Sequence, residues 1–234
     1  MILEIKSDRA NWLVDFMVSN KKMFSLNPII AGGSMLAVYR AIKLFDTDSK
    51  WAEFKRNVSV GTGYDKKKLD SFGDIDFWFH KKSAIYDANN EYNWLVSEHK
   101  DDKAYNQSLG KTIADSDIGL SRLMKTSGWA NSFLARNKPL HSGENQFIKK
   151  GANSVKDLLS TFDYINCCVA WHDGVLYCDS RIDNAFESFE LRLNSDSGLT
   201  GKSVAGRVFN ALRAFKYAKR YNLDFDVEIA NNIF

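Results

Sequence analysis

Two stretches of the sequence decide the fold and the chemistry that we predict. They read Pro28-Ile29-Ile30-Ala31-Gly32-Gly33-Ser34 and Phe72-Gly73-Asp74-Ile75-Asp76-Phe77-Trp78-Phe79. The first predicts a short buried strand that stops at two glycines, followed by a helix that begins at Ser34. The second predicts a strand whose two acids, being two residues apart, project from the same face. We therefore expect a phosphate-binding corner next to a pair of carboxylates.

The corner formed by Gly32, Gly33 and Ser34 has the composition that phosphate binding requires. Glycines allow a tight turn and let a phosphate approach the backbone amides without a Cβ in the way. The N-terminus of the following helix offers unpaired N–H groups and the positive end of the helix dipole, and Ser34 can donate its hydroxyl to a phosphate oxygen. The alternative is an ordinary strand-to-helix turn capped by serine, which is the commoner role of Gly-Gly-Ser on its own.

Asp74 and Asp76 are candidate metal ligands. Two carboxylates on one face of a strand repel each other unless a cation lies between them. Such hard oxygen ligands suit Mg²⁺, with Mn²⁺ as a substitute, and two ions would hold both the attacking and the leaving oxygen of a phosphoryl group. The alternative is a solvent-facing pair on an edge strand. The apolar residues of the same strand favour the metal site, because their packing would hold the acids in place.

Taken together, the two stretches resemble the polymerase β-type nucleotidyltransferase superfamily. That superfamily has a hydrophobic strand, Gly-Gly/Ser-Ser, a helix, and then hydrophobic-Gly-Asp-hydrophobic-Asp-hydrophobic. The resemblance covers residues 28–80. It implies an α+β fold, with a mixed sheet flanked by helices and a helical C-terminal part; the segments along the chain predict about four to six strands. It also implies Mg²⁺-dependent transfer of a nucleoside monophosphate from an NTP to an acceptor hydroxyl, with Gly32, Gly33 and Ser34 binding the nucleotide.

The sequence departs from the superfamily pattern in the distance between Ser34 and Asp74, which is longer than usual. Residues 46–68, which are polar and basic, fill this gap. They include Gly61-Thr62-Gly63 and Lys66-Lys67-Lys68. We expect an inserted loop or hairpin here that serves a particular substrate.

Asp163 is the candidate for the third carboxylate that the resemblance implies, in Phe162-Asp163-Tyr164-Ile165-Asn166-Cys167-Cys168. In the superfamily this acid contacts a metal ion and helps to deprotonate the attacking hydroxyl. The pattern Phe-Asp-aromatic-x-x-Cys followed by a hairpin is also similar to phage-encoded proteins assigned as nucleotidyltransferases, which extends the resemblance to about residue 180. The alternatives are a water-contacting Asp163 at a strand start or helix end, or Asp179 or Asp173 as the third acid.

The last predicted helix, over residues 203–221, is basic on one face. Residues 202–223 hold six basic residues and no acid. Arg213, Lys216 and Arg220 share one face, which could hold a triphosphate or an RNA backbone. An apolar stripe would dock the helix onto the core; it consists of Val204, Val208, Leu212 and Phe215. Tyr217 and Tyr221 could stack on bases, although core packing is the expected role of at least one of them. The alternative is an ordinary solvated basic face.

The remaining segments predict a core domain over residues 1–195 and a helical C-terminal segment over 196–234. Further helices are expected at 8–20, capped by Asp8, and at 34–45, 83–97, 154–160, capped by Ser154, and 182–193. Strands are expected at 29–31, 72–80, 129–134, 146–149, 162–171 and 175–178, with a turn at His172-Asp173-Gly174. The last segment shows no strand pattern.

Composition narrows the class of protein. The 234 residues carry a net charge of +3, with three cysteines that form no CxxC pair, so the sequence favours neither a disulfide framework nor a zinc site. The four histidines show no metal-ligand spacing, and we expect them at surface or turn positions; they are His80, His99, His141 and His172. No signal peptide or apolar run of about 20 residues is present, which predicts a cytoplasmic protein without a membrane partner.

The sequence thus predicts a nucleotidyltransferase that uses an NTP and an RNA or tRNA acceptor. Two alternatives stay open. One is a non-catalytic member of the fold that binds RNA or a host protein, and the other is an enzyme with a protein or small-molecule acceptor. Which NTP is used and the oligomeric state are left open as well.

Overall fold

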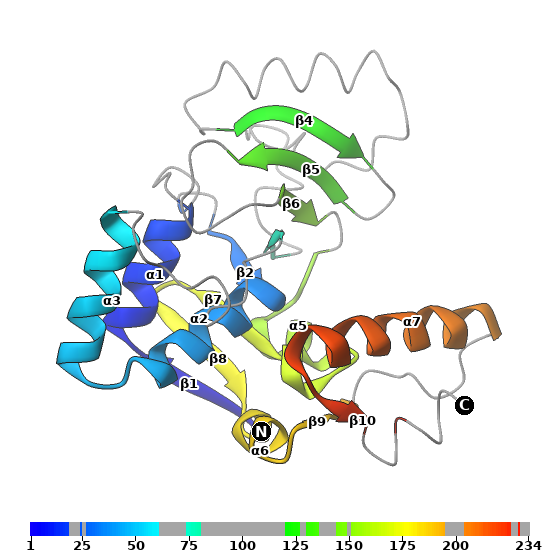
Figure 1. Ribbon diagram of the computed structural model, residues 1–234. Coiled ribbons are helices and arrows are strands. Elements are labelled where there is room, and N and C mark those ends of the chain that lie inside the picture. Colours follow the sequence, from blue (N-terminus) through cyan, green and yellow to red (C-terminus); the bar gives the residue numbers. More distant parts are fainter. Residues whose placement is uncertain are drawn as a thin grey trace.

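The computed structural model describes residues 1–18, 24, 27–60, 74–80, 120–126, 130–135, 144–148, 151–194, 204–225 and 229. Within these residues the chain forms a mixed eight-stranded sheet with the strand order β1-β8-β7-β2-β3-β6-β5-β4, together with a two-stranded sheet of β10 and β9 (Figure 1). Helices flank the large sheet, so the predicted α+β class is confirmed. The prediction of four to six strands was too low.

The elements have the following bounds. The strands of the large sheet are β1 (Ile2–Lys6), β2 (Ile29–Ala31), β3 (Ile75–Trp78), β4 (Leu120–Thr126), β5 (Ala130–Ala135), β6 (Glu144–Ile148), β7 (Val169–His172) and β8 (Val175–Asp179). The small sheet consists of β9 (Glu190–Leu191) and β10 (Asp224–Phe225). The helices are α1 (Asp8–Val18), α2 (Gly33–Leu44), α3 (Asp48–Val60), α5 (Val155–Ser160), the 3₁₀ helix η4 (Ile165–Cys167), α6 (Ile182–Glu187) and α7 (Val204–Tyr221).

Strand β3 lies in the interior of the large sheet, antiparallel to β2 and parallel to β6. Its apolar residues Ile75 and Phe77, with Phe79 beyond it, are at most 3% exposed and join the larger core cluster, to which α1 and α2 contribute. A second cluster, built by α5 with Ile29 and Ala31 of β2, covers the other face. Because side chains alternate along a strand, Asp74 and Asp76 project from the face opposite to Phe77.

The segment 46–68, predicted as a loop or hairpin, contains helix α3, so that prediction was wrong. Trp51, Phe54 and Val58 recur at helical spacing, and Phe54 and Val58 are buried. Trp51 packs edge-on against Trp12 of α1, with ring centroids 5.7 Å apart. The charged residues between these apolar positions made the segment look like a polar loop, so its helical stripe was not recognised. Residues 61–68, with their glycines and lysines, lie outside the described residues, as does the predicted helix 83–97.

The strand predicted over 162–171 is also shorter than expected, because residues 165–167 form η4 and strand β7 begins only at Val169. Asn166 explains the interruption. Its side chain donates to the Glu190 carbonyl (3.1 Å) and accepts from the Arg192 amide (3.0 Å), so it replaces a strand partner for this backbone. The helix predicted over 182–193 is also shorter than expected. It ends at Glu187, because strand β9 follows at Glu190.

Several local predictions are confirmed. The turn between β7 and β8 has positive φ at Asp173 (46°) and Gly174 (78°), which suits a two-residue hairpin. Ser154 caps α5 by accepting from the Asp157 amide at 3.1 Å. For α1, however, the capping side chain is Ser7, whose hydroxyl accepts from the Ala10 amide at 3.2 Å, and not Asp8.

Helix α7 packs with a different face from the one predicted. Ala214 and Ala218 are buried, whereas Val208, Leu212 and Phe215 of the predicted docking stripe are 55%, 64% and 48% exposed. The C-terminal part also contains a strand, β10, which pairs in parallel with β9 and so ties this part to the core. The domain boundary near residue 195 borders the undescribed residues 195–203 and stays a prediction.

None of the helices in the described ranges is long and apolar enough to cross a membrane.

Candidate functional site

The site begins at Gly32, between β2 and α2. Gly32 has φ 90° and ψ −146°, a conformation that only glycine adopts without strain. Its amide donates to the Val169 carbonyl at 3.0 Å, which fixes the corner against β7. A Cβ built on Gly32 would lie 3.5 Å from Oδ2 of Asp76. The glycine corner and the acidic strand, predicted separately, therefore meet in space.

Ser34 lies in the first turn of α2. Its side chain is 1% exposed, and its hydroxyl has no hydrogen-bond partner among the described residues. Leaving a buried hydroxyl without a partner is costly. The observation fits a hydroxyl that is kept for a ligand at the start of the helix.

Asp76 lies on β3, opposite Ala31 of β2, and Asp74 directly precedes the strand. Asp74 is exposed and accepts from Nε2 of Gln146 on β6 at 2.9 Å, and Asp76 is partly buried. Burial, and then the charge of Asp74, raise the pKa of Asp76 to about 7. Two interacting carboxylates of this kind are suited to a hard divalent cation, so the donor set fits Mg²⁺.

Helix α7 contributes positive charge to the same place. Lys216 and Arg213 both act electrostatically on Asp76 and oppose the rise of its pKa. One turn further along, Nη1 of Arg220 would lie 3.9 Å from a Cβ on Gly33. The start of α2, the acids of β3 and the cations of α7 therefore surround one site.

Asp163, predicted as a metal ligand, has the guanidinium of Arg213 as its immediate partner. It lies in the connection between α5 and η4, is 8% exposed, and forms an ion pair with Arg213, with 2.8 Å between Oδ2 and Nη1. In the described part of the chain, no three His, Cys, Asp or Glu side chains are grouped as metal ligands. The structure thus joins Asp74 with Asp76 but does not bring Asp163 into a triad with them.

The two alternative third acids lie elsewhere. Asp179 is 3% exposed, and its carboxylate accepts three hydrogen bonds from the backbone and guanidinium of Arg181, at 2.8 to 2.9 Å. Burial opposes ionisation, but these hydrogen bonds outweigh it and hold the pKa of Asp179 below its usual value. Asp173 lies in the β7–β8 turn. Asp179 thus has a structural role, and neither acid joins Asp76.

Comparison with protein families places the chain. The model of the family described as "Gad2: Gabija anti-defense 2 family protein" matches residues 4–191 of the 234. The chain belongs to the Gad2 family. A search of curated proteins found no match.

Solved structures similar to this Gad2 chain are nucleotidyltransferases. A CCA-adding enzyme in complex with ATP is 12% identical, with a TM-score of 0.49; the match covers 100% of the Gad2 chain and 46% of the enzyme. A tRNA nucleotidyltransferase bound to a primer tRNA and an ATP analog is 16% identical, with a TM-score of 0.42 and coverage of 91% and 47%. The Thermotoga maritima CCA-adding enzyme with tRNA is 13% identical, with a TM-score of 0.44 and coverage of 97% and 44%. The Gad2 chain spans less than half the length of these proteins.

Two residues of the Gad2 site were not predicted. Gln146 was expected on a strand, but its contact with Asp74 depends on the parallel pairing of β3 with β6, which no local pattern indicates. Tyr217 was considered for base stacking or core packing, yet it hydrogen-bonds to Arg213 and lies near Asp76. Its position at helical spacing from Arg213 was the one signal available.

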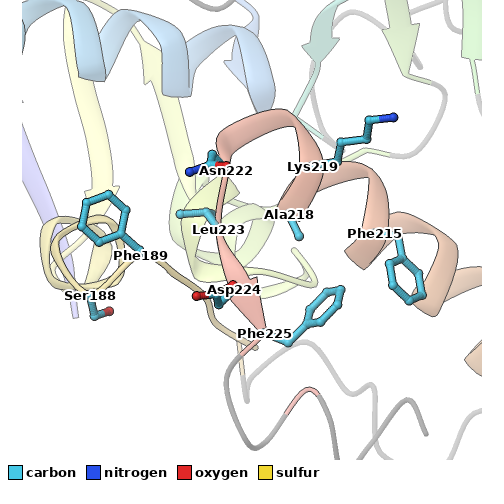
Figure 2. Close-up of a pocket in the computed structure, with 9 residues that line it drawn as sticks. All are labelled: Ser188, Phe189, Phe215, Ala218, Lys219, Asn222, Leu223, Asp224 and Phe225. Atoms are coloured by element: carbon cyan, nitrogen blue, oxygen red, sulfur yellow. The ribbon is translucent and has the colours of Figure 1, made fainter.

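A separate pocket of the Gad2 chain, of about 520 Å³, lies where α7 ends and β10 begins. Figure 2 shows the rings of Phe215 and Phe225 on one side of it and Phe189 on the other, with the Lys219 side chain pointing away. The rings of Phe215 and Phe225 meet edge to face, 5.1 Å apart. The residues that line this pocket include neither Asp74 nor Asp76, so it is distinct from the site above.

Proposed function

We propose that this Gad2-family chain is a metal-dependent nucleotidyltransferase that moves a nucleoside monophosphate from an NTP to an acceptor hydroxyl and releases pyrophosphate. The observation that supports the proposal is the short distance between the Gly32 corner and the carboxylate of Asp76, which a Cβ on Gly32 would approach to 3.5 Å. A helix N-terminus is suited to phosphate and a carboxylate pair to a divalent ion.

The residues of the chain have distinct roles in this proposal. The corner of Gly32 and Gly33 lets the triphosphate approach the start of α2, and Ser34 donates its buried hydroxyl to a phosphate oxygen. Asp74 and Asp76 hold Mg²⁺ or Mn²⁺, which would offset the charge that develops on the reacting phosphate.

Helix α7 completes the electrostatics. Lys216 offsets negative charge at the triphosphate, and Arg213 does the same while Asp163 and Tyr217 fix its position. Such preorganised charge is effective because no side chain has to rearrange during the reaction. The role of Asp163 as a third metal ligand stays a prediction.

The acceptor that we propose first is an RNA hydroxyl. Lys219 is exposed on α7, one turn beyond Lys216, and its charge suits a backbone phosphate of the acceptor. The family description, Gabija anti-defense, links the chain to inhibition of Gabija defence. We infer that the transfer modifies a component that Gabija defence requires.

The test is transfer of label from [α-³²P]NTP in the presence of total RNA or of a lysate from cells that carry Gabija. We expect labelled product with the parent chain, none with [γ-³²P]NTP, and a loss of at least a hundredfold with Asp74→Asn/Asp76→Asn. Asp48→Asn is the matched control, since Asp48 is fully exposed and forms only a surface ion pair with Arg9. Undiminished transfer by the double variant would exclude the proposed site. RNase or protease treatment of the product identifies the acceptor.

A second candidate function is non-catalytic binding of a host protein. It is favoured by the exposed apolar side chains of Val208, Leu212 and Phe215 on α7, because such patches often mark interaction surfaces. An anti-defence assay in cells separates the two functions. If Leu212→Ser/Phe215→Ser abolishes protection and Asp74→Asn/Asp76→Asn does not, the chain acts by binding; the reverse result supports catalysis.

A further inference from the structure

Two histidines that are 92 residues apart in the sequence meet on the large sheet. His80 follows β3 and His172 ends β7, and their Nε2 atoms lie 3.4 Å apart. Both side chains are partly buried. β2 runs between β3 and β7, so this pair spans the end of β2.

The separation of the two nitrogens is unusual for a hydrogen bond. An N–H donor normally lies about 2.7–3.2 Å from its acceptor. By contrast, two imidazole nitrogens bound at about 2.0–2.1 Å to a tetrahedral Zn²⁺ are roughly 3.3–3.4 Å apart. The rings are also inclined to each other at 65°, with centroids 5.0 Å apart, as two ligands converging on one point can be.

The other nitrogen of His172 fixes the tautomer that a metal ligand needs. Nδ1 lies 3.1 Å from the carbonyl oxygen of the buried Pro28. A carbonyl only accepts, so Nδ1 carries the proton and donates it, and the neutral ring then has its lone pair on Nε2. This arrangement, in which one ring nitrogen donates to a backbone carbonyl while the other binds the ion, is usual for metal-binding histidines.

We propose that His80 and His172 form a binding site for a tetrahedral divalent metal ion, with Zn²⁺ as the best match and water in the remaining positions. Nitrogen ligands from imidazole suit Zn²⁺ and not Mg²⁺. The site is separate from the carboxylate pair, because His80 is four residues beyond Asp76, or about 13 Å along an extended chain. A bound ion would connect β3 to β7 across β2.

The experiment is calorimetric titration of Zn²⁺ into the chain carrying Asp74→Asn/Asp76→Asn, so that the carboxylate pair contributes no binding. We expect one ion bound with a dissociation constant on the order of micromolar. His80→Gln or His172→Gln should each weaken it at least tenfold, and His99→Gln and His141→Gln, at the other two histidines, should leave it unchanged. The melting temperature of this Asp74→Asn/Asp76→Asn chain should rise by about 5–10 °C at a free Zn²⁺ concentration roughly hundredfold above the dissociation constant.

A measurement on the unaltered histidines protects the test against variants that fail to fold. In ¹⁵N-edited spectra of imidazole nitrogens, Zn²⁺ should shift the Nε2 resonances of His80 and His172 and leave the Nδ1 proton of His172 in place. The proposal is overturned if the Asp74→Asn/Asp76→Asn chain binds no Zn²⁺, if either glutamine variant in that background binds it as tightly, or if the two Nε2 resonances do not move.

Discussion

Gly32, just after β2, and Asp76 of β3 are spatial neighbours, because a Cβ at position 32 would lie 3.5 Å from Oδ2 of Asp76. Glycine is needed here for two reasons. The backbone has φ 90°, which an L side chain rarely adopts. The missing side chain also leaves one side of the carboxylate uncovered, so a ligand of Asp76 can reach the backbone of the corner.

Gly32→Ala should therefore impair the site more than the fold. We expect nucleotide transfer to fall at least tenfold and the free energy of unfolding to fall by about 1–2 kcal/mol, from the unfavourable φ. Transfer is measured with [α-³²P]NTP and stability by urea unfolding. Gly174→Ala is the control, because Gly174 has φ 78° but lies in the β7–β8 turn. It should lose similar stability and keep its activity; equal transfer by both variants would contradict the assigned role of Gly32.

Local patterns were sufficient for those backbone features of the fold that depend on neighbours in the chain. The glycines at 32 and 33, the alternation around Asp76 and the turn at Asp173-Gly174 all reflect backbone geometry over a few residues. Each of these residue patterns favours one local backbone conformation, so the sequence predicts that conformation correctly. The same holds for the Ser154 cap, which satisfies an amide three residues away.

Features that depend on tertiary packing could not be predicted in this way. The hydrophobic period of α7 indicated that Leu212 would be buried, but Ala214 and Ala218 face the core instead, which allows a closer approach of the helix. The ion pair of Asp163 with Arg213 joins residues 50 positions apart. The contact of His80 with His172 depends on the order of β3, β2 and β7 in the sheet. The spacing of these histidines in the sequence does not predict it.

The buried hydroxyl of Ser34 gives a second prediction. Ser34→Ala should leave the free energy of unfolding unchanged or slightly higher, because it removes a buried polar group that has no hydrogen-bond partner in the described ranges. If the hydroxyl binds a phosphate oxygen, the affinity for Mg-NTP should fall about tenfold, the usual value of a hydrogen bond to a charged group. Calorimetry with a non-hydrolysable NTP measures this. A clear loss of stability with unchanged affinity would show instead that Ser34 is a structural residue.

The raised pKa of Asp76 leads us to expect that, in the absence of metal, the free energy of unfolding depends on pH. Its pKa is raised to about 7 in the folded chain, from 3.8. Between these values the folded state keeps a proton that the unfolded state has lost, so the free energy of unfolding should fall as the pH rises from about 4 to about 7 and level off above. The decrease is on the order of 1–4 kcal/mol.

Thermal unfolding in EDTA, from pH 5 to pH 8, checks this against Asp76→Asn. The variant should lack this decrease and be the more stable of the two at pH 8. Stabilisation of the parent by Mg²⁺ should increase as the pH rises through 7 and then level off, since the ion and the proton compete for the same oxygens. Identical pH profiles for the parent and Asp76→Asn would mean that this carboxyl is not perturbed in solution.

The ion pair between Asp163 and Arg213 allows a decision between two roles of the acid. If Asp163 acts by holding Arg213, then Asp163→Asn and Arg213→Gln should lower transfer by similar amounts, about tenfold each. The double variant should then be little worse than either, because both changes remove the same interaction. If Asp163 binds a metal ion, Asp163→Asn should reduce transfer as severely as Asp76→Asn, and its effect should multiply with that of Arg213→Gln. A Mn²⁺ titration of each variant gives an independent readout, since only loss of a metal ligand raises the concentration of ion needed for half-maximal activity. The 2.8 Å contact leads us to expect coupled effects and an unchanged requirement for metal.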